Sequence, residues 1–322
     1  RLVGPLGEVV AIEDRFGASA PFKDMMEHYG FTGAQVAERA KALLADAAAE
    51  AVRAGTPYAD NATAAAFALQ QDEIVISIHC GSRGLGHQIG TEFLKSMAIK
   101  AQDHGITLPD RELACAPIES HLGQSYLGAM RAAANFAWCN RQLVTWEVRQ
   151  VWKNTFGPGV SPPEVLYDVA HNIAKVETHE IEGEPRKVIV HRKGATRAFG
   201  PWHEEIPCSH KPYGQAVLIP GSMGTSSYVL AGARESAHVA FGSCCHGAGR
   251  RLSRTAAKKQ VNAPVLKQAL QEAGIYLQAS YRRIAEEAPE AYKDVDAVVR
   301  SVSAAGVVTP VAQLKPLAAI KG

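Results

Sequence analysis

The chain has 322 residues, of which 47% are hydrophobic and 20% are charged, and its formal net charge is +2. This length suits one large globular domain or two medium ones. Such a small net charge excludes a general basic field for nucleic acid, so any polyanion site has to be local. No apolar run reaches the roughly 20 residues of a membrane-spanning helix, and the opening RLVGPLGEVVAIEDRFG lacks the basic and apolar regions of a signal peptide. We expect a cytoplasmic protein without membrane association.

The first predicted elements are helices over residues 21–56, where apolar residues recur at helical spacing. Residues 74–78, rich in β-branched side chains, predict a short strand. A helix is expected from Gly84 to about Gln102, and a long helix over SYLGAMRAAANFAWCNRQLVTWEVRQVW at 125–152.

The second half of the chain is richer in strand patterns. EVLYDVA at 164–170 predicts a strand, and KVETHEI and RKVIVHRKG predict a hairpin around the turn EGEP at 182–185. Further strands are expected in GQAVLIP and AHVAFGSCCHGAG, and helices in APVLKQALQEAGIYLQAS and YKDVDAVVRSVSAAG. Because helices and strands do not alternate regularly, we predict an α+β fold in a single large domain, with mixed or antiparallel strands flanked by helices.

Six cysteines occur, namely Cys80, Cys115, Cys139, Cys208, Cys244 and Cys245. None forms a CxxC pair, which argues against a zinc ribbon. We interpret Cys244 and Cys245 as small core residues and all six thiols as reduced.

Four apolar runs end in residues that can carry chemistry. One ends at His79, one at His171 and Asn172, one at the turn GSMG, and one at His246. Glycine turns let backbone N–H groups approach phosphate oxygens closely, and HGAGRRLSR adds three arginines. Each histidine has an alternative interpretation as a half-buried structural residue, and each basic or glycine-rich stretch as a solvated turn or helix.

Seven motifs together are more specific than any one of them. They are HCGSRGLGHQIG, YDVAHNIAK, HRKGATRAFGP, IPGSMGTSSYVL, SCCHGAGRRLSRTAAKK, YKDVDAVV and LKPLAAIKG. In wording and order they resemble the RtcB family of RNA ligases from about residue 60 to 322. The resemblance implies one RtcB-like ligase domain over 1–322, with a poorly matched helical part at 1–59 and the catalytic core at 60–322.

The resemblance implies a GTP- and Mn²⁺-dependent ligase for tRNA splicing or RNA repair. His246 would attack the α-phosphate of GTP and carry GMP through a phosphoramidate. GMP would pass to an RNA 3′-phosphate, formed where necessary from a 2′,3′-cyclic phosphate, and the 5′-hydroxyl of a second RNA end would displace it. The implied partners are RNA ends such as tRNA halves or damaged RNA, GTP, and an activating protein that the sequence does not identify.

Site residues follow from the same match. His79 and His171 match manganese ligands, since imidazole suits this ion beside carboxylate and thiolate. The residues that match contacts to GTP are His171, Asn172, Pro220, Gly221, Ser222, Met223, Ser227, His246, Gly247, Ala248, Gly249 and Lys321. The candidates for RNA phosphates are Arg83, Arg192, Lys193, Arg197 and Arg250.

Two manganese-binding motifs of the family, Asp-x-x-Cys-Gly and Gly-x-x-Asn-His, do not occur in this sequence. We expect the natural protein to contain segments that this sequence lacks. Two alternatives stay open: a ligase-like protein that binds guanine nucleotide or RNA ends without sealing them, and a metal-dependent phosphoesterase.

Overall fold

The computed structural model describes residues 2–3, 9–10 and 61–321. The chain divides into two compact units, one made of Arg1–Ala37 and Ser77–Val151 and the other of Glu38–Ile76 and Trp152–Gly322. The α+β class is confirmed, because long helices and mostly antiparallel strands are both present. The helices expected at 21–56 lie outside the described residues, and a single domain over 1–322 stays a prediction.

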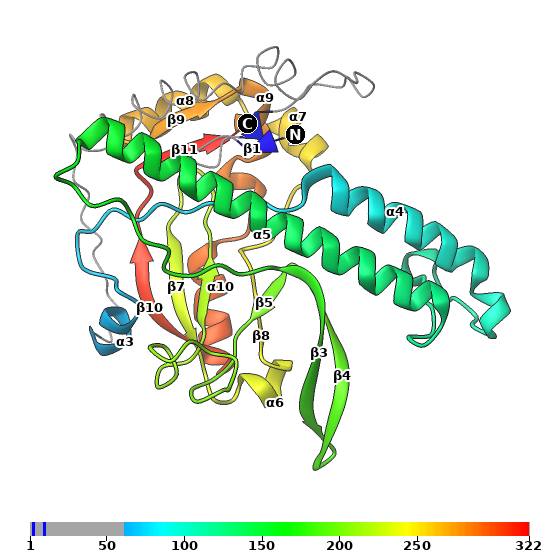
Figure 1. The fold of residues 1–322 in the computed structure, drawn as a ribbon. Helices are drawn as coiled ribbons and strands as arrows, with labels where there is room; N and C mark the ends of the chain where they lie inside the picture. Colours follow the sequence, from blue (N-terminus) through cyan, green and yellow to red (C-terminus); the bar gives the residue numbers. More distant parts are fainter. Residues whose placement is uncertain (1, 4–8, 11–60, 322) are drawn as a thin grey trace. The chain divides into compact units, whose positions relative to one another are not determined.

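The first unit is mainly helical in its described part. Its elements are β1 (Leu2–Val3), β2 (Val9–Val10), α4 (Arg83–Lys100), η2 (Gln102–His104), η3 (Arg111–Leu113) and α5 (His121–Phe156), the last turn of which belongs to the second unit. Helices α4 and α5 confirm the helical periodicity (Figure 1). Asn140 Nδ2 of α5 donates to the carbonyl oxygen of Gly81 at 3.0 Å, and Arg141 Nη1 to that of Cys80 at 3.2 Å. These bonds attach the segment after His79 to α5.

The second unit contains most of the strands. Its elements are α3 (Asn61–Ala66), β3 (Asn172–Ile181), β4 (Glu184–Lys193), β5 (Ala195–Arg197), β6 (Ala216–Ile219), β7 (Ser227–Gly232), α6 (Ser236–Ala240), β8 (Ser243–Cys245), α7 (Arg254–Gln260), α8 (Ala263–Glu272), β9 (Tyr276–Ala279), α9 (Tyr281–Glu286), η4 (Pro289–Ala291), α10 (Val295–Ala304), β10 (Val308–Leu314) and β11 (Ala318–Lys321). None of the helices in the described residues is long and apolar enough to cross a membrane.

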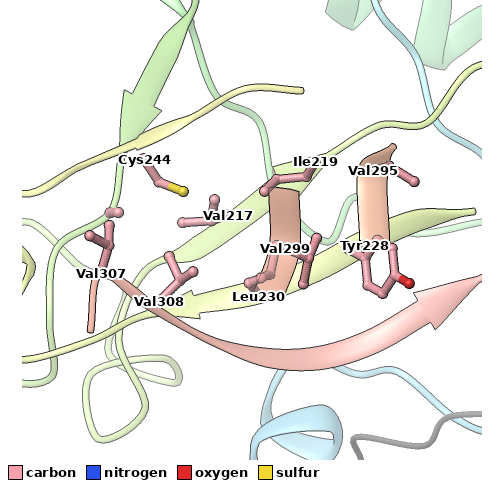
Figure 2. Close-up of a cluster of buried hydrophobic side chains, with 10 residues drawn as sticks. Val217, Ile219, Tyr228, Leu230, Cys244, Val295, Val299, Val307 and Val308 are labelled. Atoms are coloured by element: carbon pink, nitrogen blue, oxygen red, sulfur yellow. The ribbon is translucent and has the colours of Figure 1, made fainter. Parts of the chain in front are cut away.

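A three-stranded antiparallel sheet in the order β10–β7–β6 lies at the centre of the second unit. Figure 2 shows its main apolar cluster, in which Val217 of β6 and Leu230 of β7 lie with Val299 of α10 and Cys244 of β8. Cys244 is therefore a core residue, as predicted. Strand β8, which carries Cys244, therefore packs in this core, and His246 directly follows the end of this strand.

The predicted hairpin is confirmed as β3 paired with β4 over ten residues each (Figure 1). Its turn places Glu182 at φ 55° and Gly183 at φ 81°, as tight hairpin turns require. The strand predicted within AHVAFGSCCHGAG is present only over its middle part, as β8, and GQAVLIP contains β6.

Other strand predictions were wrong. Residues 74–78 and 164–170 have no regular secondary structure, and no described strand pairs with either segment. A strand needs a hydrogen-bonded neighbour, so an apolar run alone does not make one. Within AHVAFGSCCHGAG the first part forms the short helix α6, and APVLKQALQEAGIYLQAS ends as strand β9. His171 consequently precedes a strand, β3, whereas the sequence predicted that it follows one.

Candidate functional site

His171 and His246 lie next to each other although they are far apart in the chain. His246 directly follows β8 and His171 directly precedes β3, and their ring centroids are 4.1 Å apart at an angle of 62°. The backbone of Gly194, at the end of β4, connects them. Its N–H donates to the carbonyl oxygen of His171 at 2.8 Å, and its own carbonyl accepts from the His246 N–H at 3.2 Å.

The surroundings of His246 favour a neutral imidazole. Burial lowers the pKa of His246 from its ordinary value, and the charge of His171 lowers it further. A neutral ring nitrogen keeps the lone pair that a nucleophile uses. A hydrogen bond from Cys244 lowers the pKa of the neighbouring Cys245 thiol from its ordinary value, although burial of this thiol raises it.

A glycine-serine turn closes beside this pair. The N–H of Gly221 donates to Oγ of Ser227 at 3.0 Å, and the N–H of Ser222 donates to Oγ1 of Thr225 at 2.7 Å. A Cβ at Gly221 would lie 2.1 Å from the carbonyl oxygen of Ser226, so only glycine fits the turn. A Cβ at Gly247 would lie 3.8 Å from the carbonyl oxygen of Pro220. The turn after β6 and the loop after His246 are therefore neighbours.

Most residues predicted to hold the nucleotide belong to these segments. Oδ1 of Asn172 accepts from the N–H of Gly194 at 3.1 Å, so this oxygen supports the corner between the histidines. Ala248 packs against the main core cluster, and Gly249, at φ 74°, accepts from the N–H of Lys293 at 3.0 Å.

Met223 and Lys321, which were also predicted to contact the nucleotide, lie in other surroundings. Met223 is 1% exposed as a whole residue and packs in a core cluster with Leu270 and Ile275, so its side chain contacts the core and not a nucleotide. Lys321 pairs with Ala279 through strands β11 and β9, and its side chain lies outside the described residues.

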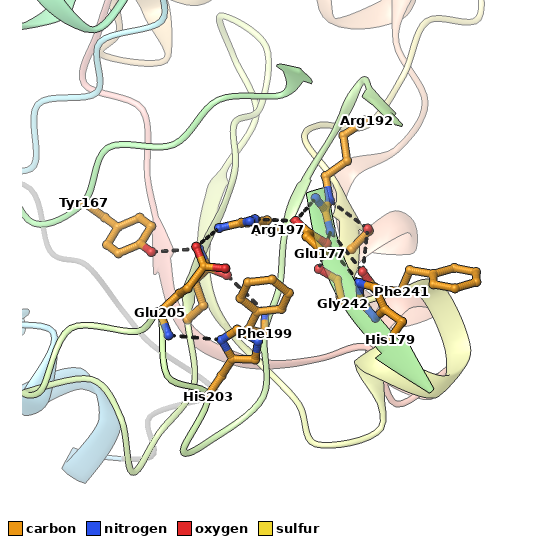
Figure 3. Close-up of polar contacts among 12 residues, drawn as sticks. Tyr167, Glu177, His179, Arg192, Arg197, Phe199, His203, Glu205, Phe241 and Gly242 are labelled. Atoms are coloured by element: carbon orange, nitrogen blue, oxygen red, sulfur yellow. Dashed lines mark hydrogen bonds and ion pairs between the residues drawn. The ribbon is translucent and has the colours of Figure 1, made fainter. Parts of the chain in front are cut away.

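The structure contradicts Arg192 as a ligand of RNA phosphate. Arg192 is 3% exposed, and its Nη1 and Nη2 donate to the two carboxylate oxygens of Glu177 at 2.7 and 2.9 Å. Arg197 Nε donates to the same carboxylate at 2.7 Å, and Arg197 Nη1 to Glu205 at 2.6 Å. Figure 3 shows Glu177 between both arginines and His179. Its burial raises its pKa, but the hydrogen bonds from Arg192 and His179 and the two arginine charges lower it to about 2.

Arg250 is also engaged within the protein. Its Nε donates to the carbonyl oxygen of Leu252 at 3.0 Å, its Nη1 to the hydroxyl of Tyr292 at 2.9 Å, and its Nη2 to the carbonyl oxygen of Glu286 at 2.6 Å. Lys193 is exposed at the end of β4. Arg83, at φ 52°, begins α4 in the first unit. Of the two cations predicted on β4, only Lys193 faces solvent.

The two histidines predicted to bind manganese belong to different units of the chain. His171 belongs to the second unit, and His79 is an exposed residue of the first unit. Among the residues that the structure describes, no group of three or more His, Cys, Asp or Glu side chains is arranged to hold a metal ion. The described residues therefore do not form a complete manganese site.

Sequence reasoning missed Gly194 and Glu177. A glycine directly after a predicted strand in HRKGATR was the available signal for Gly194. No local signal marked Glu177, because a strand pattern does not reveal which acidic residue lies next to buried arginines from other segments.

Residues 53–322 match the family model described as tRNA-splicing ligase RtcB. The chain is 50% identical over 266 residues to the tRNA-splicing ligase RtcB of Archaeoglobus fulgidus, covering 82% of this chain and 55% of that protein. It is 51% identical over 267 residues to that of Pyrococcus furiosus, covering 82% and 28%. It is 48% identical over 264 residues to the RNA-splicing ligase RtcB of Mycobacterium bovis, covering 82% and 60%. The chain thus matches between about a quarter and three fifths of these relatives' own lengths.

Proposed function

This chain belongs to the RtcB family of tRNA-splicing ligases, and from that membership we propose that it contains the GTP-dependent nucleotidyl-transfer site of an RNA ligase. The whole protein would join RNA 3′-phosphate or 2′,3′-cyclic phosphate ends to 5′-hydroxyl ends, in tRNA splicing or RNA repair. The observation that carries the proposal is His246, a half-buried imidazole 4.1 Å from the ring of His171 and beside the Pro220–Gly221 turn.

In this proposal a neutral ring nitrogen of His246 attacks the α-phosphorus of GTP. A phosphorus–nitrogen bond forms, the bond to the β-phosphate oxygen breaks, and pyrophosphate leaves. An oxygen of the RNA 3′-phosphate then displaces the imidazole and takes GMP. The 5′-hydroxyl of the second RNA end finally attacks the 3′-phosphate and expels GMP.

The chain's own groups position these steps. The backbone N–H groups of the loop Gly247–Gly249 suit phosphate oxygens, and Gly194 holds the two histidines by its backbone. Asn172, Ser222 and Ser227 shape the same corner through their side-chain oxygens.

Manganese dependence is proposed for the whole ligase, with His79 and His171 as ligands that this chain contributes. The described residues supply too few ligands for a complete site, so no step of the chemistry is derived through the ion.

Labelled GTP tests the proposal. Incubating the chain with GTP labelled at the α-phosphate and Mn²⁺ should give an acid-labile protein adduct, because phosphoramidates hydrolyse in acid. His246→Ala should abolish the adduct. His191→Ala, which changes an exposed histidine on β4, is the matched control and should keep it. Wild-type protein without an adduct, or an adduct that survives in His246→Ala, would contradict the proposal.

A second candidate is a guanine-nucleotide and RNA-end binding protein that does not seal RNA. The incomplete ligand set among the described residues favours it. Incubation of the chain with 3′-phosphate and 5′-hydroxyl RNA ends, GTP and Mn²⁺ separates the two. A sealed product rules out the binding protein, whereas tight nucleotide binding without product supports it.

A further inference from the structure

A basic surface covers the short helices α7 and α9, which contact each other in the second unit. We call it the α7–α9 surface and define it by Arg254, Lys258, Lys259, Tyr281, Arg282 and Arg283. None of these residues was among the predicted RNA contacts. Two carboxylates that are mostly buried form ion pairs with several of these cations.

Glu286 is the first of these carboxylates. Its side chain is almost fully buried. Its carboxylate oxygens form ion pairs with Lys258 Nζ at 2.7 Å, Arg283 Nη1 at 2.9 Å and Arg282 Nε at 3.4 Å. Lys258 comes from α7 and the two arginines come from α9. One buried acidic group therefore holds cations of two helices in fixed positions.

Glu287 is the second carboxylate, and it lies within 3.5 Å of Arg250 Nη1 and within 3.6 Å of Arg254 Nε. Five cations thus surround two carboxylates, and an excess of positive charge stays at the surface. The Arg254 and Arg282 side chains are 67% and 70% exposed although each has an acidic partner. Lys259 on α7 adds another exposed cation.

An exposed aromatic side chain lies on α9. Tyr281 is 58% exposed, and Lys267 Nζ of α8 lies 5.8 Å from the centre of its ring. Exposed aromatic rings among cations are typical of surfaces that bind single-stranded nucleic acid, since the ring stacks on a base while the cations bind the phosphates.

The α7–α9 surface is continuous with the loop that follows His246. Arg250 forms a bridge to Tyr292, and the N–H groups of Arg251 and Lys293 bond to the carbonyl oxygens of Ala291 and Gly249. The chain therefore runs directly from the nucleotide loop into this surface.

We propose that the α7–α9 surface binds the phosphate backbone of single-stranded RNA next to its reacting end, with Tyr281 stacking on a base. The inference rests on the proposed function for the identity of the polymer. In this proposal the α7–α9 surface takes the place of Arg192 and Arg250 as the contact for RNA phosphates, since the guanidinium groups of these two arginines bond within the protein.

The test uses the full chain and a single-stranded oligo-uridylate, with either a 3′-phosphate or a 3′-hydroxyl, in a fluorescence-anisotropy titration at several salt concentrations. The variant combines Arg254→Gln, Lys259→Gln and Arg282→Gln. We expect its affinity for both RNAs to fall at least about tenfold at low salt. The slope of log affinity against log salt should become shallower by about 2, since each phosphate contact on a single strand contributes about 0.7.

A matched triple variant removes the same charge elsewhere. It combines Arg186→Gln and Lys187→Gln on the β3–β4 hairpin with Arg300→Gln on α10, all of them exposed. It should keep the wild-type affinity and slope. Tyr281→Ala should weaken binding several-fold at every salt concentration, whereas Tyr281→Phe should keep the affinity because the ring remains.

Unchanged RNA affinity in the first triple variant would overturn the inference and would point to another polyanion, such as an acidic protein. An equal loss in the matched variant would also overturn it. Adduct formation with labelled GTP separates this result from the proposed function: the first triple variant should form the His246 adduct at the wild-type level. If the wild-type protein forms no adduct but RNA binding follows the surface, only the proposed chemistry fails.

Discussion

Adjacent residues on one strand have opposite environments in this protein. Arg192 and Lys193 are consecutive on β4, and side chains alternate between the two faces of a strand. Arg192 is buried against Glu177, whereas Lys193 is exposed. A sequence motif rich in basic residues predicts that some of them meet phosphate, but the burial of each one depends on segments that pack against the strand. The same reason explains why Glu177 was missed.

We predict that Glu177→Gln destabilises the fold by about 3 kcal/mol at neutral pH, because it leaves two arginines beside an uncharged amide in a buried site. Glu177 has a pKa of about 2 in the folded protein, below its ordinary value of 4.5. A carboxylate with a lowered pKa stabilises the fold at pH values above its ordinary pKa. This stabilisation is lost as the pH falls from the ordinary pKa towards 2.

Urea unfolding of wild type and Glu177→Gln at a series of pH values checks this. The difference in unfolding free energy should be full above about pH 5 and should narrow below about pH 4.5. The exposed Glu182→Gln on the hairpin turn is the control and should differ little from wild type. A difference between wild type and Glu177→Gln that stays constant from pH 7 to pH 3 would contradict the assignment.

Elements in this protein position the site mainly through their ends. The β3–β4 hairpin begins directly after His171 and ends directly before Gly194, so its full register brings those two residues together. Strand β8 then pairs with β5 and places His246 against the same glycine. The hairpin turn and the helices α4, α5, α8 and α10 were predictable because their signals are local. The lack of strands at 74–78 and 164–170 could not be predicted, because a segment's own sequence does not show whether another strand lies beside it to pair with.

Gly194→Ala tests the role of this corner. Gly194 has φ 70°, which favours glycine, and a Cβ there would lie 3.9 Å from Cε1 of His246. We expect a loss of about 1 kcal/mol of stability from the backbone and a several-fold lower yield of the His246–GMP adduct, because the hydrogen bonds to both histidines shift.

Gly183→Ala provides the comparison for this variant. Gly183 has φ 81° at the distant hairpin turn, and no atom lies within 4 Å of its added Cβ. It should cost similar stability and leave the adduct yield unchanged. Equal adduct yields for Gly194→Ala and Gly183→Ala would show that Gly194 does not position the histidines.

At the scale of the second unit, one core supports both the sheet and the site. The main apolar cluster joins β6, β7 and β10 to α10 and, through Cys244, to strand β8, which His246 directly follows. The turn at Pro220 follows β6, and α10 begins shortly after the segment that contacts the loop from Gly249. The site therefore lies on the ends of elements that share this core.

We predict that Leu230→Ala, at a fully buried position of the central strand β7, destabilises the protein by about 2–5 kcal/mol, because it leaves a cavity among close-packed side chains. Chemical denaturation measures the change. Leu143→Ala, at an exposed position of α5, removes the same atoms and should cost much less. Equal losses for the two variants would mean that this cluster does not dominate the stability of its unit.

The sequence alone determined the α+β class, the family, the hairpin and the four longest helices of the described residues, namely α4, α5, α8 and α10, and it predicts His246 as the nucleophile. These features depend on residues close together in the chain or on an ordered set of motifs, which a sequence displays directly. Only the tertiary structure decided that His171 lies against His246, that Arg192 and Arg250 bond within the protein, and that Met223 is in the core. It also placed cations of α7 and α9 around two carboxylates. Those outcomes depend on packing between distant segments, because burial and hydrogen bonding are set by the neighbours that each side chain meets in the fold.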